Sequence, residues 1–324
     1  MPVTWGILST AGINRKFLAG AREAHNAQVV AVASRDPVVA RDYADAHGIE
    51  RAHGDYEALL ADPGVEAVYI PLPNSMHVEW SVRALEAGKH VLCEKPLSRS
   101  AAEVERAFEV AAREDRLLME GFMYRHNPQS ARLLELLADG AIGRVRMIRA
   151  AFSFVVEDPA NVRLSGALNG GALMDVGSYC VSGARMIAGE PLRVGGEQVL
   201  GGDGVDVAFA ATLRFPGDVL AHFDAGLALA DRDELEVIGD GGSLFLDDPW
   251  HCLEPIIELR RASGVERIEV ERVNSYRLEV ENLSSAIRGT APPLLGRDDA
   301  LGQARAIEAL HASAQRGETV ALGS

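Results

Sequence analysis

Two short segments of this chain carry side chains that can move protons and stabilise developing charge. The first places a lysine directly after an apolar, strand-like run, Val91-Leu92-Cys93-Glu94-Lys95-Pro96. The second follows a glycine pair with an acid and a phenol, Asp175 and Tyr179, which are four residues apart and share one helical face. Because tyrosine has an ordinary pKa of about 10, it needs a cation beside it to accept a proton near neutral pH. We therefore predict that Lys95 assists Tyr179 in proton transfer and that Asp175 orients Lys95 or a substrate.

Each of these residues also has a purely structural interpretation. An exposed lysine can begin a helix, an aspartate can cap one, and a core tyrosine can satisfy its hydroxyl internally. The chemical interpretation gains weight from the place of Lys95 at the C-terminal end of a predicted parallel strand, where open α/β sheets bind their ligands.

The elements that must position these residues form two patterns. Up to about residue 122, apolar runs at 3–8, 29–33, 67–70, 90–93 and 117–120 alternate with amphipathic stretches at 37–47, 77–87 and 101–114. This alternation predicts an α/β domain over 1–122 with a parallel sheet and right-handed crossovers, the arrangement that binds dinucleotides.

The second pattern is richer in strands. β-type runs lie at 146–155, 207–215, 219–227, 234–238, 243–246 and 267–273, and helices are expected at 129–138, 171–187, 278–288 and 299–316. We predict an α+β domain over 123–324 with a mostly antiparallel sheet that is covered on one face.

The first predicted strand leads into a turn that resembles a phosphate-binding loop. It reads Gly6-Ile7-Leu8-Ser9-Thr10-Ala11, a G-x-G-x-x-G pattern with Leu8 and Ala11 at the second and third glycine positions. Leu8 would keep the backbone away from a pyrophosphate unless the turn is built differently, whereas Ser9 and Thr10 offer hydroxyl groups. The N–H groups at the start of the following helix can also bind an anion. An ordinary strand–helix turn is the alternative interpretation.

The second predicted strand ends in Ala33-Ser34-Arg35-Asp36, at the position that distinguishes NAD from NADP. A fold that prefers NAD usually has an acid here, which binds the ribose hydroxyls. Arg35 is suited to a phosphate, because its guanidinium makes paired charge-assisted hydrogen bonds and stacks on adenine. We therefore expect NADP as the cofactor. In the alternative, Arg35 is an exposed loop cation, Asp36 binds the ribose, and the cofactor is NAD.

Composition narrows the remaining choices. The chain has 324 residues, enough for two domains, and a formal charge of −15, which argues against a nucleic-acid partner. No apolar run is long enough to cross a bilayer, and no signal peptide is visible. Cys93, Cys180 and Cys252 have no metal-binding spacing, so we expect free thiols, a cytoplasmic protein, no metal ion and no membrane partner.

Taken together, these segments resemble the Gfo/Idh/MocA family of oxidoreductases. The resemblance covers nearly the whole length and rests on Glu94-Lys95-Pro96, Pro73-x-x-x-His77, Gly121-Phe122-Met123-Tyr124-Arg125, Asn161-Val162-Arg163, Gly170-Gly171-x-Leu173-x-Asp175-x-Gly177-x-Tyr179, Asn274-Ser275-Tyr276-x-x-Glu279 and Ser313-Ala314-x-x-Gly317. Two positions depart from the family pattern, Asn169 in place of a frequent third glycine and Leu283 in place of a frequent phenylalanine. Neither departure removes a catalytic group, but both leave the identity of the substrate undetermined.

The resemblance implies a Rossmann domain and a C-terminal domain whose open-faced sheet pairs subunits into a homodimer or homotetramer. Tyr179, where many members have histidine, resembles the branch with NADP-linked D-xylose dehydrogenases, trans-dihydrodiol dehydrogenases and glucose-fructose oxidoreductase. We expect hydride transfer between NADP and a sugar, polyol or keto-sugar, with Tyr179 as the acid/base assisted by Lys95. A nucleotide-sugar keto-reductase, a trans-dihydrodiol dehydrogenase and a cofactor-binding regulator without turnover are the alternatives.

The motifs and the resemblance together assign candidate residues to three roles. The catalytic candidates are Lys95, Tyr179 and Asp175. The candidates for binding the cofactor are Ser9, Thr10, Ala11, Gly12, Ile13, Ser34, Arg35, Leu72, Pro73, Asn74, His77, Glu94, Lys95, Met123 and Arg125. The candidates for binding the substrate are Tyr124, Phe152, Asn161, Arg163, Asp175, Tyr179 and Tyr276.

Overall fold

The structure, a computed structural model, describes residues 1–323, which divide into two compact units. Unit 1 consists of Met1–Met123 and Asn274–Leu301, and unit 2 consists of Tyr124–Val273 and the residues from Gly302 onward. The predicted division between residues 122 and 123 is contiguous in sequence, whereas in the structure residues 274–301 belong to unit 1.

Within its described residues, unit 1 contains a six-stranded parallel sheet in the order β3-β2-β1-β4-β5-β6, which confirms the predicted α/β arrangement. The strands are β1 (Val3–Leu8), β2 (Ala27–Ala33), β3 (Arg51–His53), β4 (Ala67–Ile70), β5 (His90–Glu94) and β6 (Leu118–Gly121). The inner strands are buried along most of their length, as expected for a parallel sheet covered on both faces.

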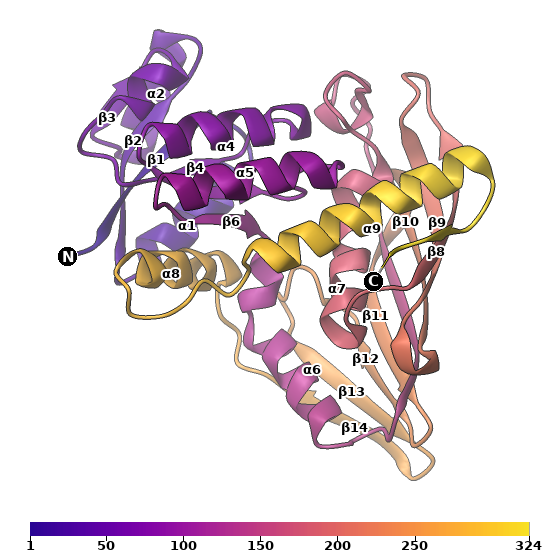
Figure 1. The fold of residues 1–324 in the computed structure, drawn as a ribbon. Helices are drawn as coiled ribbons and strands as arrows, with labels where there is room; N and C mark the ends of the chain where they lie inside the picture. Colours follow the sequence, from indigo (N-terminus) through magenta and orange to yellow (C-terminus); the bar gives the residue numbers. More distant parts are fainter. Residues whose placement is uncertain (324) are drawn as a thin grey trace. The chain divides into compact units, whose positions relative to one another are not determined.

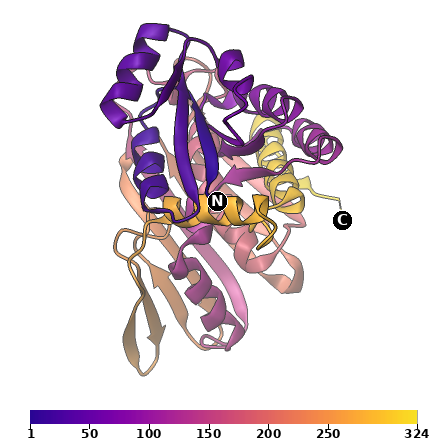
Figure 2. The ribbon, with the colours of Figure 1, turned by 90° about the vertical axis from the view of Figure 1, so that its left-hand side faces the viewer.

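The helices of unit 1 are α1 (Asn14–Glu23), α2 (Pro37–His47), α3 (Tyr56–Leu60), α4 (His77–Glu86), α5 (Ala101–Arg113) and α8 (Ser275–Ile287). Helix α8 packs on α1, as Figures 1 and 2 show. The two helices cross closely at Gly20, where a Cβ atom would lie 2.6 Å from the backbone nitrogen of Arg277. This contact explains why residues far apart in the sequence form one unit.

In the described part of unit 2, a nine-stranded sheet has the order β14-β13-β12-β11-β7-β10-β9-β8-β15, and the β7–β10 pair is parallel while its other pairs are antiparallel. The strands are β7 (Val145–Val155), β8 (Arg193–Leu200), β9 (Asp206–Arg214), β10 (Leu220–Gly226), β11 (Ala228–Gly239), β12 (Ser243–Leu246), β13 (Ile256–Arg261), β14 (Gly264–Glu269) and β15 (Val320–Ala321). The prediction of a mostly antiparallel sheet is confirmed. The run predicted at 267–273 was misplaced: the strand is Gly264–Glu269, an exposed hairpin arm whose charged residues give no apolar signal.

The helices of unit 2 are α6 (Pro128–Ala138), α7 (Ser178–Ala188) and the C-terminal part of α9 (Arg297–Arg316). A single helix was predicted over 171–187, but a π-helical turn at Leu173–Gly177 precedes α7. Helix α7 packs on β7 and β10, so one face of the sheet is covered (Figure 1). Across residues 1–323, no helix is both long enough and apolar enough to cross a membrane.

Candidate active site

The turn after β1 is built around Ser9 rather than around a second glycine. Ser9 has a φ of 143°, a conformation that side-chain-bearing residues rarely adopt, and its Oγ accepts a hydrogen bond from Ala11 N at 3.2 Å. The carbonyl of Ser9 accepts a bond from Nδ2 of the buried Asn14 at 2.8 Å. Three N–H groups of the turn donate no hydrogen bond to another described residue, those of Thr10, Gly12 and Ile13. Unpaired N–H groups before a helix are the donors that a phosphate requires.

The end of β2 presents a cation rather than an acid. Asp36 caps α2, because its Oδ1 accepts a hydrogen bond from Val38 N at 2.8 Å. Arg35 is exposed, and its charge opposes the burial that raises the pKa of Tyr56. The carboxylate that would bind a ribose in the NAD alternative therefore uses one of its oxygens, Oδ1, to cap a helix.

The predicted cofactor residue His77 lies at the start of α4 and is fully buried. Its Nδ1 lies 2.8 Å from the carbonyl oxygen of Pro96, and its Nε2 lies 2.7 Å from that of Leu72. Burial lowers the pKa of His77, and the two carbonyl acceptors oppose that shift. The imidazole thus ties the turn after β4 to the turn that contains Lys95, and both of its nitrogens face backbone oxygens.

Buried acids and phenols gather near the C-terminal ends of β4 and β5. Tyr69 donates a hydrogen bond to Oε1 of Glu94 at 2.5 Å. On α8, Glu279 is fully buried, and neither of its carboxylate oxygens has a hydrogen-bond partner among the described residues. Burial, and then the charge of Glu94, hold the pKa values of Glu279 and Tyr276 well above their usual ranges. Tyr276, predicted to bind substrate, thus lies in unit 1 beside an acid whose ionisation is opposed by burial.

Unit 2 brings four aromatic side chains together around α7. The ring of Tyr179 lies 5.3 Å from Phe152 on β7 and 5.8 Å from Tyr124, and Trp250 lies 5.3 Å from Tyr124 in an edge-to-face arrangement. The hydroxyl of Tyr124 donates to Oγ of Ser182 on α7 at 2.7 Å. Three of these rings, those of Tyr124, Phe152 and Tyr179, were predicted to bind substrate.

A polar pair lies at Phe154, the next ring along β7. Nε of Arg163 lies 2.6 Å from Oδ2 of Asp175, in the π-helical turn that precedes Tyr179. The guanidinium lies 5.8 Å from the ring of Phe154, two residues along β7 from Phe152. Asn161 caps the short helical turn that carries Arg163, because its Oδ1 accepts a hydrogen bond from Arg163 N at 3.1 Å.

The helical segment that carries Asp175 and Tyr179 is held at its start by Asp206 on β9. Oδ2 of Asp206 accepts a hydrogen bond from Leu173 N at 2.6 Å. A Cβ at Gly171, whose φ is 119°, would lie only 2.1 Å from Oδ1 of Asp206, so the carboxylate uses the space that glycine leaves. Burial raises the pKa of Asp206 to about 6 against backbone hydrogen bonds that lower it. The sequence analysis did not identify this residue.

Two further residues that the sequence analysis missed adjoin the aromatic rings. Nδ1 of His251 lies 2.6 Å from Oδ2 of Asp233, and the imidazole ring lies 5.4 Å from the ring of Phe152. Neither residue belongs to a short motif, so only the fold reveals the pair.

The predicted site residues divide between the units. In unit 2, contacts link Tyr124, Phe152, Arg163, Asp175 and Tyr179 into one group, and Arg125 Nη1 donates to Ser182 Oγ at 3.4 Å. Unit 1 contains the candidates Ser9 to Ile13, Ser34, Arg35, Leu72, Pro73, Asn74, His77, Glu94, Lys95, Met123 and Tyr276. The pairing of Lys95 with Tyr179 joins residues of different units and stays a prediction.

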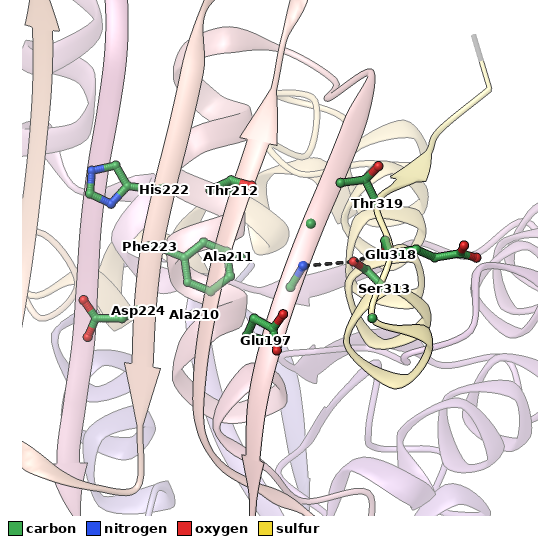
Figure 3. A pocket seen from close by; sticks show the side chains of 13 residues that line it. Glu197, Ala210, Ala211, Thr212, His222, Phe223, Asp224, Ser313, Glu318 and Thr319 are labelled. Atoms are coloured by element: carbon green, nitrogen blue, oxygen red, sulfur yellow. Dashed lines mark hydrogen bonds between the residues drawn. The ribbon is translucent and has the colours of Figure 1, made fainter.

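None of these residues lines the hollow that unit 2 contains at one end of its sheet. Strands β8, β9 and β10 and the end of α9 line it, with Thr212, Phe223 and Ser313 among the side chains (Figure 3). Ser313 Oγ accepts a hydrogen bond from Gly196 N at 2.9 Å, which is the dashed line in Figure 3, and donates to the carbonyl of Glu318 at 2.6 Å. The Ser313 motif thus fastens the end of α9 to β8.

Both halves of the chain match known family models. Residues 3–122 match the model of the oxidoreductase family with an NAD-binding Rossmann fold, and residues 130–245 match the GFO/IDH/MocA C-terminal domain. The two matches together cover most of the chain.

Individual proteins are similar over nearly its whole length. The chain is 37% identical over 325 residues to D-xylose 1-dehydrogenase (NADP(+)) 2 of Haloferax volcanii, which covers 98% of this chain and 99% of that protein. The aldose-aldose oxidoreductase from Caulobacter crescentus, complexed with glycerol, superimposes with a TM-score of 0.93 at 28% identity, over 99% of this chain and 100% of that one. KijD10, a 3-ketoreductase from Actinomadura kijaniata in complex with NADP and TDP-benzene, gives a TM-score of 0.90 at 30% identity, over 97% and 98% of the two chains.

Proposed function

Because this chain belongs to the Gfo/Idh/MocA family and is an NAD(P)-dependent oxidoreductase, we propose that it transfers a hydride between NADP and a carbinol carbon of a sugar or polyol. The observation that carries the proposal is the Arg163–Asp175 pair in unit 2, whose guanidinium lies over Phe154, the ring next to Phe152 and Tyr179. Aromatic and apolar surface with a few fixed polar groups is the usual lining of small-molecule sites. The C–H face of a sugar packs on such rings while its hydroxyls reach the polar pair.

Unit 1 has the donors that a phosphorylated dinucleotide needs. The N–H groups of Thr10, Gly12 and Ile13 have no acceptor among the described residues, so the turn after β1 fits a phosphate. The exposed Arg35 supports NADP over NAD, because a guanidinium binds a 2′-phosphate, and Asp36 already uses its Oδ1 to cap α2. When bound, the nicotinamide supplies the hydride chemistry that no side chain can provide.

The transfer of the proton then depends on the side chains of this protein. In the proposed mechanism Tyr179 accepts the proton of the substrate hydroxyl during oxidation and returns it during reduction. Lys95 lowers the pKa of that phenol or holds the substrate oxygen, because a nearby cation favours the charged form of an acid. Asp175 holds Arg163 at 2.6 Å, so the guanidinium is fixed for donation to another hydroxyl.

We also propose that the outer face of the unit 2 sheet pairs with a second copy of the chain. Side-chain alternation places Arg149 of β7 and Thr212 of β9 on the face opposite to Phe152, where both are exposed. Light scattering of the purified protein should therefore give a mass of two or four chains. A monomer at micromolar concentration would contradict this assembly.

A second candidate is a reductase that acts on a nucleotide-linked keto-sugar. The similarity to KijD10 in complex with NADP and TDP-benzene favours it. The formal charge of −15 argues against it, because a pyrophosphate on the substrate needs additional cations. The gathering of four aromatic rings in unit 2 would also suit a trans-dihydrodiol.

The first experiment follows the absorbance of reduced nicotinamide with the purified protein. Pentoses, hexoses, inositols, a trans-dihydrodiol and a nucleotide-linked keto-sugar are each tested with NADP and with NAD in the appropriate direction. Turnover of an aldose or polyol with NADP supports the proposal. Turnover with NAD alone would contradict the role of Arg35, and turnover of the nucleotide-linked sugar alone would transfer the assignment to the second candidate.

Lys95→Ala tests the proposed mechanism. This change should lower kcat by about a hundredfold or more while the affinity for NADP, measured by fluorescence titration, changes little. Lys16→Ala removes an exposed lysine of the same unit and is the matched control. Near-normal turnover of Lys95→Ala would remove this lysine from the mechanism.

A further inference from the structure

Asp233 and His251 place a fixed imidazole beside the aromatic rings of unit 2. Asp233 lies on β11 in register with Phe152 on β7, so the two side chains share one face of the sheet. His251 follows β12, and its ring meets the ring of Phe152 edge-to-face, with 5.4 Å between centroids and an angle of 84°. Tyr179 meets the same phenyl ring at 5.3 Å. One phenyl ring therefore contacts both the imidazole and the phenol of the proposed acid/base.

Asp233 uses both carboxylate oxygens to fix the segment that carries His251. Its Oδ1 accepts a hydrogen bond from Trp250 N at 3.1 Å, and its Oδ2 lies 2.6 Å from Nδ1 of His251. The fully buried indole of Trp250 donates to the carbonyl of Ala151 at 3.1 Å, which anchors the same segment on β7. A carboxylate opposite Nδ1 requires the proton to be on that nitrogen, so Nε2 of the neutral imidazole is an acceptor.

Nε2 of His251 is the polar atom that this arrangement leaves for a ligand. The side chain is 38% exposed, and no described residue donates a hydrogen bond to Nε2. Asp233 is much less exposed, and burial raises its pKa while the hydrogen bond from His251 lowers it. The carboxylate thus serves to orient the imidazole, because it gives both oxygens to this segment.

Polar groups lie at both ends of a pair of aromatic rings, of which Phe154 is the more exposed. The rings of Phe152 and Phe154 are 6.4 Å apart along β7. The guanidinium of Arg163 lies over Phe154, and His251 lies at Phe152. A molecule that packs its apolar face on these rings meets the guanidinium of Arg163 at one end and Nε2 of His251 at the other. A ring that bears hydroxyls on opposite sides satisfies both groups.

We propose that His251 is a specificity-determining residue whose Nε2 accepts a hydrogen bond from a substrate hydroxyl remote from the reacting carbon. The inference rests on the proposed function and narrows its substrate class to polyhydroxylated sugars and polyols that carry that hydroxyl. A site built to bind a hydroxyl group rejects analogues that lack it, because its polar partner is then left unpaired. Asp233 acts through His251 and is a positioning residue.

The test compares the sugar that the wild-type protein turns over best with each of its monodeoxy analogues. His251→Phe keeps a ring against Phe152 but removes Nε2. We expect it to lose about tenfold or more in kcat/KM with the parent sugar, mainly through KM. With the one analogue that lacks the recognised hydroxyl, the variant and the wild type should have equal kcat/KM. His251→Gln, which restores an acceptor, should recover part of the loss with the parent sugar.

Control variants separate recognition from stability and from metal binding. His25→Phe changes an exposed histidine of unit 1 and should leave every ratio unchanged. Ligand atoms of Asp233, Asp248 and His251 lie within 4.8 Å of one another, so each assay is repeated after treatment with EDTA. A loss in the EDTA-treated wild type equal to that of His251→Phe would assign the effect to a bound cation and overturn the proposal.

The remaining outcomes distinguish this inference from the function on which it rests. An equal loss with the parent sugar and all analogues would make His251 merely structural, and an unchanged kcat/KM would remove it from recognition. Either result overturns the inference and leaves the proposed reaction standing. A wild-type protein that turns over no sugar or polyol contradicts the proposed function itself, and the inference with it.

Discussion

Replacing Asp206 by Asn should make unit 2 more stable, relative to the wild type, as the pH rises. Asp206 is 3% exposed, and its Oδ2 accepts the N–H of Leu173 at the start of the segment that carries Tyr179. Burial raises the pKa of this carboxyl to about 6 from an ordinary value of 3.8, because desolvation outweighs the backbone hydrogen bonds that favour the charge. The folded protein therefore holds this proton more tightly than the unfolded chain does.

Proton linkage gives the direction and the size of the effect. Between about pH 4 and about pH 6 the unfolded chain loses the proton first, so the wild type loses stability as the pH rises, and the loss is complete above the folded pKa. A difference of about two pKa units corresponds to about 3 kcal/mol. The side chain of D206N does not titrate, and its amide oxygen can still accept the N–H of Leu173. The free energy of unfolding of D206N minus that of the wild type should thus rise by about 2–3 kcal/mol from about pH 4 to about pH 8.

Urea unfolding followed by tryptophan fluorescence measures this difference. Trp250 lies in unit 2, whereas Trp5 and Trp80 lie in unit 1, so a background with the latter two changed to Phe reports on unit 2. Asp158→Asn is the matched control, because it changes an exposed carboxylate of the same unit that also accepts a backbone N–H. If the difference in free energy of unfolding between D206N and the wild type does not change with pH, burial does not dominate the pKa of Asp206. A falling difference would mean that the N–H groups of the helix start lower the pKa instead.

Three other substitutions test separate parts of the structure. Gly183→Ala should destabilise unit 2 by about 1–3 kcal/mol in urea unfolding, because a Cβ there would lie 2.7 Å from Cη2 of the buried Trp250, and the gain in stability usual for a helical glycine would contradict this packing. Glu279→Gln should reduce the loss of unit 1 stability with rising pH, because burial and the charge of Glu94 hold the pKa of Glu279 well above its usual range and the native state resists its ionisation. If the urea midpoints of Glu279→Gln and of the wild type depend on pH in the same way, that reasoning is refuted. Tyr179→Phe should lower kcat by about a hundredfold or more and leave NADP binding intact, whereas near-normal turnover would exclude this phenol from proton transfer.

The strands of unit 1 were predictable because parallel strands that are covered on both faces are continuous apolar runs. The predicted ranges 3–8 and 67–70 coincide with β1 and β4. Strand β3 was missed, because Arg51–His53 is short, half-buried and not apolar. The helix at α8 was predicted. Its amphipathic pattern shows that one face of the helix is buried, but not which of the two units it packs against. Tyr276, on that helix, was therefore expected in the second domain and lies in unit 1.

Polar contacts between distant residues are the part of the site that the sequence could not supply. Asp36 and Asn274 each cap a helix by accepting the backbone N–H two residues further along the chain, and such local caps follow recognisable sequence patterns. Asp206 instead holds a helix start 33 residues before it, and Asp233 meets His251 across 18 residues. These contacts depend on strand register and loop length, which no fixed spacing encodes.

The return of residues 274–301 to unit 1 ties the completion of that unit to the order in which the ribosome makes the chain. Trp5, in the first strand, is fully buried, and its indole donates a hydrogen bond to Ser284 Oγ at 3.2 Å. A nascent chain that has reached residue 123 contains the six strands of its sheet, but it lacks this acceptor and the helix that lies on α1 at Gly20. Folding from the N-terminus can therefore begin this unit but cannot finish it. Synthesis that stops anywhere before α8 leaves the indole of Trp5 without its acceptor and α1 without the helix that packs on it, an incomplete fold that chaperones and proteases can recognise.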